Sequence, residues 1–252
     1  MESTPRLSPG TRLLYAGVIP FLGVLLLWIV FVIDHSYALG IDRFGILPRE
    51  WSGLSGVVAA PFLHGDAEHL FNNSIPLLLL GWCMMHFYPR VAGKVILYSW
   101  VGGGMLVWIT ARPDMHIGAS GVVYGMAAFL FFSGFIRRQR ALMAISLLVV
   151  FLYGGMVWGV LPLMPRVSWE SHLWGGLVGA FMAWRSRYVA PSNIPPQVVL
   201  ADDDDDATPG VGPLIITYHT DPGDEDDQPA RNTDARRTGT ALDGDRTDIM
   251  LP

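Results

Sequence analysis

The chain of 252 residues is 51% hydrophobic and 15% charged, whereas a soluble domain usually carries about 25% charged residues. Residues 1–190 hold 13 Lys and Arg against 8 Asp and Glu (net +5), and residues 191–252 hold 4 against 14 (net −10). This composition argues against a cytosolic globular enzyme. A single cysteine, Cys83, excludes an internal disulfide, a multi-cysteine zinc site and an iron–sulfur cluster.

Six apolar stretches lie within the first 190 residues. Each approaches the ~20 residues that a helix needs to cross about 30 Å of hydrocarbon. The sequence therefore predicts an all-α membrane protein, a bundle of six transmembrane helices. Their approximate limits are 12–33, 65–88, 92–111, 118–136, 141–161 and 170–188.

The expected domain organisation follows from these spans and from the change of composition after them. Residues 1–11 form an N-terminal cytoplasmic segment, residues 12–190 the six-helix domain, and residues 191–252 an acidic cytoplasmic tail. The tail is rich in Pro, Gly, Thr and Asp and is expected to be disordered, because it has too little apolar surface to bury. Anionic lipids of the inner leaflet repel its charge, so we expect it to recruit a basic cytoplasmic partner or to govern stability.

Positive charges predict the orientation of the helices, because cytoplasmic flanks carry the excess of Lys and Arg. With the N-terminus inside, nine such residues flank the cytoplasmic ends and four flank the outer ends. The cytoplasmic group is Arg6, Arg12, Arg90, Lys94, Arg137, Arg138, Arg140, Arg185 and Arg187, and the outer group is Arg43, Arg49, Arg112 and Arg166. We therefore expect a multi-pass protein of the cell membrane with both termini cytoplasmic.

Polar side chains inside membrane spans are costly and are therefore candidate functional residues. His69 and Asn73 are four residues apart near the outer end of the second span and share a helix face. Ser120 lies at the outer end of the fourth span, and His172 opens the sixth. The predicted orientation puts all four on the outer side, where a water-filled pocket would explain why they are tolerated.

A serine and a histidine together indicate nucleophilic catalysis, because a serine hydroxyl is weak until a neighbouring imidazole takes its proton. The acidic residues of the body lie in termini, loops or span ends, so the sequence favours a Ser120–His172 dyad without an orienting carboxylate. Glycines flanking Ser120, Gly118 among them, let backbone amides and substrate approach closely. The Asn73 amide, the His69 ring and the Ser120 N–H are candidate donors to an oxyanion.

Two further features are expected to support this site. Tyr124, one turn below Ser120, is placed to pack on the His172 ring and hold it. Gly175 and Gly179 are interpreted as helix-packing residues that draw the sixth span against the fourth. Such packing would shorten the distance between Ser120 and His172.

Three motifs resemble those of the rhomboid intramembrane serine proteases. They are HLFNN at 69–73, GASGVVYG at 118–125 and HLWGGLVG at 172–179. Each motif alone is weak, but three of them in the family's order on the expected spans form a specific signal. The resemblance covers about residues 12–188 and implies a rhomboid-like fold.

The resemblance implies that Ser120 is the nucleophile, that His172 is the base, and that His69 and Asn73 belong to the oxyanion site. It implies that His64 is a structural histidine. It also implies substrates that are single-pass transmembrane proteins, whose helices unwind locally near the outer leaflet. Membrane lipids are expected to surround the protein. Neither a metal ion nor an organic cofactor is implied, and nucleic acid is not an expected partner.

Other functions remain open at this point. An aspartyl intramembrane protease needs two aspartates in the interior of spans, and the aspartates of residues 1–190 lie only in loops or at span ends. A zinc protease normally has an H-E-x-x-H motif, which is absent, although His64, Glu68 and His69 resemble a spaced variant. The alternative to an enzyme is a six-span transporter, or an inactive binder of transmembrane helices, and neither needs a serine–histidine pair.

Overall fold

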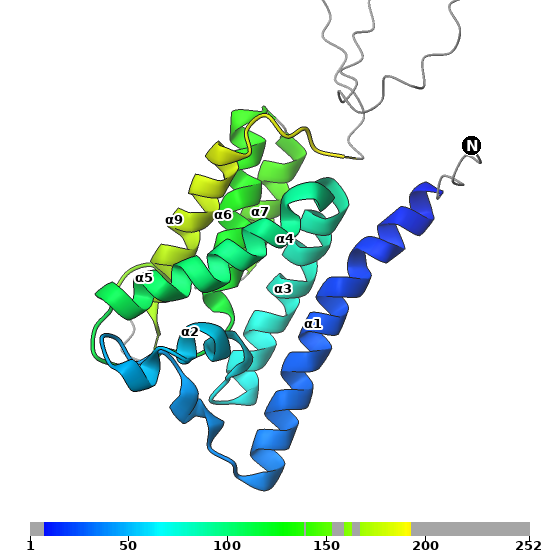
Figure 1. Ribbon diagram of the computed structural model, residues 1–252. Helices are drawn as coiled ribbons and strands as arrows, with labels where there is room; N and C mark the ends of the chain where they lie inside the picture. The colour runs from blue at the N-terminus through cyan, green and yellow to red at the C-terminus, as the bar shows by residue number, and fades with distance from the viewer. Residues whose placement is uncertain (1–7, 139, 153–158, 163–166, 193–252) are drawn as a thin grey trace, which may run out of the picture. The chain divides into compact units, whose positions relative to one another are not determined.

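The structure of the chain is a computed structural model, and it describes residues 8–138, 140–152, 159–162 and 167–192 (Figure 1). The chain divides into two units, Met1–Ile194 and Pro195–Pro252, and all described residues belong to the first. These residues form helices and no strand, with one isolated bridge between Ile46 and His116. The predicted all-α class is confirmed for this part of the chain. The predicted tail, apart from residues 191 and 192, lies outside the described residues.

Short helical turns separate the first two long helices. The short elements are the 3₁₀ helices η1 (Ile41–Phe44), η2 (Trp51–Gly53) and η3 (Ala60–Phe62) and the four-residue helix α2 (Gly56–Ala59). The longer helices are α1 (Pro9–Tyr37), α3 (Ala67–Phe87), α4 (Pro89–Leu97), α5 (Gly103–Thr110), α6 (Ser120–Ile136), α7 (Arg140–Leu152) and α9 (Trp169–Arg185).

Local sequence explains where several of these helices begin. Ser8 caps α1 because its hydroxyl accepts a 3.2 Å hydrogen bond from the Thr11 N–H. Asp66 caps α3 in the same way through a 2.7 Å hydrogen bond from the His69 N–H. Pro89 begins α4, since its fixed φ suits the first helical turn, where no N–H is needed.

Helices α4 and α5 form one continuous segment, Pro89–Thr110. A π-helical turn, η4 (Tyr98–Gly102), joins them. The indole N–H of Trp100 in this turn donates to the Val57 carbonyl of α2 at 3.1 Å. The segment between α1 and α3 is therefore tied to the third predicted span.

Helix α6 is the centre of the hydrophobic core. It lies next to α9, α7 and α3, and Phe129 and Leu130 near its middle are fully buried. Leu80 and Met84 of α3 and Ala183 of α9 complete the same cluster. Because α6 is surrounded by other helices, the position of its first residue, Ser120, is fixed by the core.

The predicted spans lie at the positions of the observed helices, but their first and last residues differ from those of the helices. The first predicted span, 12–33, lies within the longer α1, and the described part of the fifth, 141–161, is helical to Leu152, with residues 153–158 outside the described residues. Two helical segments among the described residues are long and apolar enough to cross a bilayer by themselves, α1 and Pro89–Thr110. Helix α6 has only 17 residues, at the lower end of the ~17–25 that span a membrane. Six transmembrane spans therefore remain a prediction.

Candidate active site

Ser120 is the first residue of α6, and the loop of residues 111–119 leads into it. The first N–H groups of a helix have no partner within the helix. The aligned peptide dipoles also give this end a partial positive charge. The hydroxyl of Ser120 therefore lies where backbone donors and a favourable dipole are available to an anion.

His172 lies in the first turn of α9 and contacts Ser120 directly. Its Nε2 atom is 2.8 Å from Ser120 Oγ, and its Nδ1 atom is 2.8 Å from the carbonyl oxygen of Gly159. A carbonyl oxygen can only accept a hydrogen bond, so Nδ1 carries the hydrogen and donates it to Gly159. In the neutral ring Nε2 is then the unprotonated atom, and it faces the serine hydroxyl.

The ring of Tyr124 fixes the plane of His172. The two rings are stacked, with centroids 4.1 Å apart and an angle of 9° between their planes. Tyr124 follows Ser120 by one helical turn, so α6 carries both the hydroxyl that faces Nε2 and the ring that lies flat on the imidazole. His172 is thus held by a carbonyl at Nδ1, a hydroxyl at Nε2 and an aromatic ring on one face.

Two glycines of α9 allow it to approach α6 closely. A Cβ on Gly175 would overlap the carbonyl oxygen of Gly121, and a Cβ on Gly179 would overlap that of Gly125. Each would also lie 2.8 Å from the corresponding carbonyl carbon. No larger residue fits at either position unless the helices move apart. This contact brings the start of α9 within hydrogen-bonding distance of the start of α6.

His69 and Asn73 of α3 lie next to the loop that precedes Ser120. Gly118 has a φ of 103°, which favours glycine, and a Cβ there would lie 2.6 Å from His69 Nε2 and 3.5 Å from Asn73 Nδ2. Both polar atoms therefore face the backbone two residues before Ser120. The structure brings all four candidate catalytic and oxyanion residues to one end of the bundle.

His64 lies behind Asn73. Asn73 Nδ2 is 3.1 Å from His64 Nε2, and the rings of His64 and His69 meet edge to face with centroids 5.0 Å apart. Burial, together with the neighbouring His69, lowers the pKa of His64 to about 4. His64 is therefore neutral near pH 7 and accepts a hydrogen bond from the Asn73 amide, which has a second N–H for another acceptor.

Sequence reasoning found no hydrogen-bonding partner for His172 Nδ1, whereas the structure assigns this contact to the backbone carbonyl of Gly159. Every residue has a carbonyl group, so the sequence carries no direct signal for such a contact. The available signal is indirect: a Cβ at residue 159 would overlap the Tyr124 hydroxyl and lie 2.9 Å from His172 Nδ1. Glycine at this position lets the chain pass close to both rings.

The zinc alternative has no support in the geometry of the described residues. Among them, no group of three or more His, Cys, Asp or Glu side chains is arranged to hold a metal ion. Glu68, part of the spaced variant of the zinc motif, is exposed at the start of α3. His64 is instead engaged with Asn73.

Comparison with known proteins adds independent findings. The profile of the Rhomboid domain matches residues 50–188. An uncharacterized protein of Mycobacterium tuberculosis is 35% identical over 191 residues, which cover 72% of this chain and 79% of that protein. An uncharacterized protein of Mycobacterium leprae is 35% identical over 188 residues, covering 69% and 72%. A RHOMBOID-like protein of Arabidopsis thaliana is 29% identical over 130 residues, covering 50% and 32%.

Proposed function

The chain belongs to the rhomboid family, whose members are integral membrane proteins, and we propose that it is an active serine endopeptidase that cleaves transmembrane proteins. The observation that carries the proposal is the pair of contacts made by His172. Its Nε2 atom lies 2.8 Å from Ser120 Oγ, while its Nδ1 atom is engaged by Gly159. An inactive relative has no need for a serine and a histidine in this geometry.

The proposed reaction has two steps. In the first, Ser120 Oγ attacks the carbonyl carbon of the substrate peptide as His172 Nε2 takes the hydroxyl proton. His172 then gives this proton to the leaving amine, so the C–N bond breaks and an ester to Ser120 remains. In the second step, water attacks the ester while His172 accepts its proton. The ester bond breaks, the new carboxylic acid leaves, and Ser120 regains its hydrogen.

The Gly159 carbonyl has the role that an aspartate has in a catalytic triad. By accepting from Nδ1–H it holds the tautomer in which Nε2 is basic. A neutral carbonyl stabilises the imidazolium less than a carboxylate does. The stacked Tyr124 ring supplies orientation instead, because it limits rotation of the imidazole about its side-chain bonds.

We assign stabilisation of the oxyanion to three kinds of donor. The side chains are His69 Nε2 and Asn73 Nδ2, which face the backbone at Gly118, and the third is the backbone N–H at the start of α6. Asn73 is 5% exposed and has its amide engaged by His64. This contact holds the second N–H in place before the substrate arrives, so little reorganisation is needed in the transition state.

The positive-charge count supports a membrane orientation for this site. Nine Lys and Arg residues flank one set of helix ends and four flank the other, so we propose that both termini are cytoplasmic and that the dyad opens to the outside. The proposed substrates are single-pass proteins cut near the outer leaflet. We keep residues 12–190 as the protease domain and residues 191–252 as a tail that binds a basic cytoplasmic partner or governs stability.

Activity-based labelling tests the proposal directly. Full-length protein, purified in detergent, should react covalently with a serine-reactive fluorophosphonate and should cleave a transmembrane substrate. Ser120→Ala and His172→Ala should each abolish both signals while remaining folded, because nucleophile and base act as one unit. A transporter or an inactive binder of helices would not be labelled at Ser120. Near-normal turnover by Ser120→Ala would exclude the serine mechanism.

A further inference from the structure

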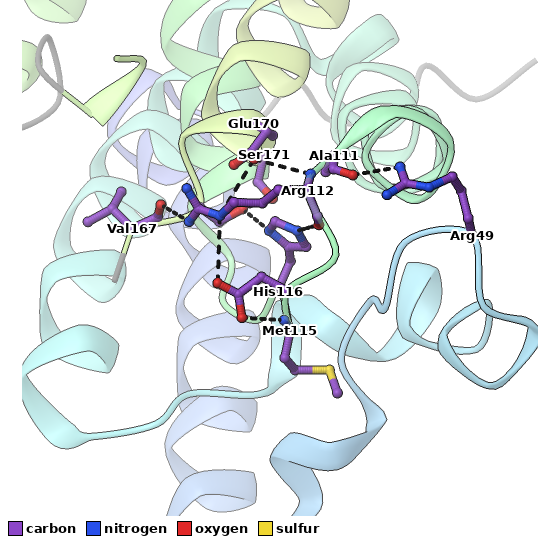
Figure 2. A network of polar contacts seen from close by, with 10 residues as sticks. Arg49, Ala111, Arg112, Met115, His116, Val167, Glu170 and Ser171 are labelled. Atoms are coloured by element: carbon purple, nitrogen blue, oxygen red, sulfur yellow. Dashed lines mark hydrogen bonds and ion pairs between the residues drawn. The ribbon is translucent and has the colours of Figure 1, made fainter. Parts of the chain in front are cut away.

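Polar contacts attach the loop before Ser120 to the start of α9 (Figure 2). Arg112, two residues after the end of α5, donates from Nη2 to the Val167 carbonyl at 2.9 Å. Its Nε atom lies 3.7 Å from Glu170 Oε1, and Glu170 is buried at 4% exposure. Loop 111–119 leads to Ser120, and α9 carries His172, so these contacts join the two segments that carry the dyad.

His116 makes the second attachment, and its contacts define its hydrogen positions. His116 Nε2 is 3.2 Å from the Arg112 carbonyl oxygen, so it carries the hydrogen. Nδ1 is 2.6 Å from Ser168 Oγ and, in the neutral ring, accepts a hydrogen bond from that hydroxyl. Ser168 Oγ is in turn 2.6 Å from Ser171 Oγ, which must donate to it. The chain of hydrogen bonds therefore runs from α9 to loop 111–119.

Ser168 occupies the N-cap position of α9, but its side chain makes no capping hydrogen bond to that helix. A serine at this position usually accepts from an N–H in the first turn. Here the hydroxyl is committed to His116 and Ser171. The carbonyl of Ser168 accepts from the His172 N–H at 3.3 Å, so Ser168 joins His116 to the catalytic histidine through one side-chain and one backbone contact.

The other side of His116 is held by a separate part of the chain. Its N–H donates to the Ile46 carbonyl, and its carbonyl accepts from the Ile46 N–H, both at 2.9 Å. Two residues later the Gly118 N–H donates to the Ala60 carbonyl at 2.8 Å. The His116 ring, which is 1% exposed, therefore stands on a backbone that cannot easily move. In the contact between His116 and Ser168, His116 is therefore the fixed residue, and it holds Ser168 in position.

We propose that His116 is a positioning residue of the protease: through Ser168 it holds the start of α9 against the loop of Ser120 and so sets the separation of Ser120 and His172. Both dyad residues follow a partner of this contact by four residues, so a shift between His116 and Ser168 is transmitted to the dyad through a short length of backbone. The inference rests on the proposed function.

The physical reason is that the dyad tolerates little displacement. Its hydrogen bond is 2.8 Å long, and a misplacement of about 1 Å can cost about 10²-fold in rate. The glycine contacts between α6 and α9 act across the helix axes and set how closely the two helices approach, so resistance to sliding of α9 along its axis depends on contacts at its end. The contact between His116 and Ser168 lies at the end of α9, where it opposes such sliding.

The test uses two matched pairs of variants in the full-length protein. Ser168→Ala removes the hydroxyl, whereas Ser168→Thr keeps it. His116→Leu and His116→Asn introduce side chains of similar size, but only the asparagine side chain keeps a hydrogen-bond acceptor near the position of Nδ1. Thr110→Val is the control, because it deletes a 2.7 Å hydrogen bond from Trp174 of α9 that does not involve loop 111–119.

The readouts are the rate of Ser120 acylation by a fluorophosphonate, kcat and KM for a transmembrane substrate, and the melting temperature in the same detergent. We expect Ser168→Ala and His116→Leu to lower the acylation rate and kcat by about 10- to 100-fold with little change in KM. Threonine and asparagine should restore most of the rate, and Thr110→Val should match the wild type. If His116 and Ser168 had a merely structural role, their variants would change the melting temperature without lowering kcat and the acylation rate at nearly constant KM.

Two results would overturn the positioning role. One is a wild-type acylation rate in Ser168→Ala, and the other is an equal loss in both members of each pair. Ser168 is only partly buried, so its variants decide the question if His116→Leu does not fold. Failure of the proposed function is distinguishable, because the wild-type protein itself would then show no labelling at Ser120, and the positioning role would fall with it.

Discussion

Replacing Gly175 with alanine should push α9 away from α6. A Cβ at residue 175 would overlap the Gly121 carbonyl oxygen and lie 2.8 Å from the carbonyl carbon, whereas ordinary contacts of a Cβ begin at 3.4 Å. The opposing atoms belong to a helix backbone, so no side chain can rotate away to make room. The helices must separate locally by at least 0.6 Å, the difference between these distances, and by more to clear the oxygen.

This displacement acts on the dyad, because Gly175 follows His172 by three residues and Gly121 adjoins Ser120. Added to the 2.8 Å between His172 Nε2 and Ser120 Oγ, it gives about 3.4 Å or more, the limit of a hydrogen bond. We therefore expect Gly175→Ala to lower kcat by about 10- to 100-fold. Overpacking of this kind also lowers the free energy of unfolding by about 1–3 kcal/mol.

The neighbouring glycine provides a matched control. A Cβ on Gly176 would meet no atom within 4 Å, so Gly176→Ala changes the same helix without touching α6. Cleavage of one transmembrane substrate at several concentrations, with melting temperatures in the same detergent, measures both variants. Gly176→Ala should keep the wild-type kcat. The reasoning is refuted by a wild-type kcat in Gly175→Ala, or by equal losses in the two variants.

Three further predictions use the same preparations. Asn73→Ala should lower kcat about 10²- to 10³-fold relative to the wild type, because it removes one donor to the charge that develops only in the transition state. An unchanged kcat would mean that Asn73 serves only in packing. Deleting residues 191–252 should leave cleavage intact, because the positive-charge count puts the tail across the membrane from Ser120; a loss above tenfold, about 1.4 kcal/mol, in a folded protein would contradict this orientation. Between about pH 7 and pH 5, the melting temperature of the wild-type protein should fall more steeply with acidification than that of the His116→Asn variant.

The sign of the third prediction follows from burial. Burial is the main cause that lowers the pKa of His116 from 6.5 in the folded protein, so the unfolded chain binds the proton more tightly. The free energy of unfolding is therefore retained above pH 6.5 and falls as the pH drops from 6.5 towards the lower folded value. The charged groups acting on the ring are Glu170, Arg112 and Asp114. Equal pH slopes in the two proteins would contradict the assignment.

The tail deletion is designed around contacts that the structure describes. Arg137, after the end of α6, donates to the carbonyl groups of Ser186 and Val189. A protein that ends at residue 190 keeps both contacts, whereas a shorter one would lose them. Loss of activity in a protein truncated before Ser186 would report this anchor and would say nothing about the tail.

Patterns in the sequence predicted the helical class, the family and the places of the long helices, because apolar length and polar interruptions are local properties. They also named Ser120 and His172 as candidate catalytic residues, and the fold brings Ser120 Oγ and His172 Nε2 to 2.8 Å from each other. The contacts of His116 were not predictable in this way. His116 and Ser168 lie in different loops, and nothing in the residues near either one specifies the other as a partner.

The short helices between α1 and α3 were missed for a related reason. Each has only three or four residues, too few for a period to appear. The segment that contains them is held by contacts with distant groups, such as the 2.6 Å hydrogen bond that the Arg49 guanidinium donates to the Ala111 carbonyl. Tertiary contacts of this kind, rather than local propensity, shape the segment that supports the loop before Ser120.

The contacts that attach α1 to the rest of the helices determine which substitutions α1 accepts. The Trp82 indole donates to the Leu13 carbonyl at 2.8 Å, and the Trp28 indole donates to Ser74 Oγ at 3.0 Å. These points are 15 residues apart on α1, about 22 Å along its axis, so the two contacts together oppose rotation of the helix and determine which face is turned outward. Positions on that face, such as Leu14 and Ile19, are 69% and 61% exposed. A mutational scan should therefore find them interchangeable among apolar residues, with lipid solubility as the only requirement.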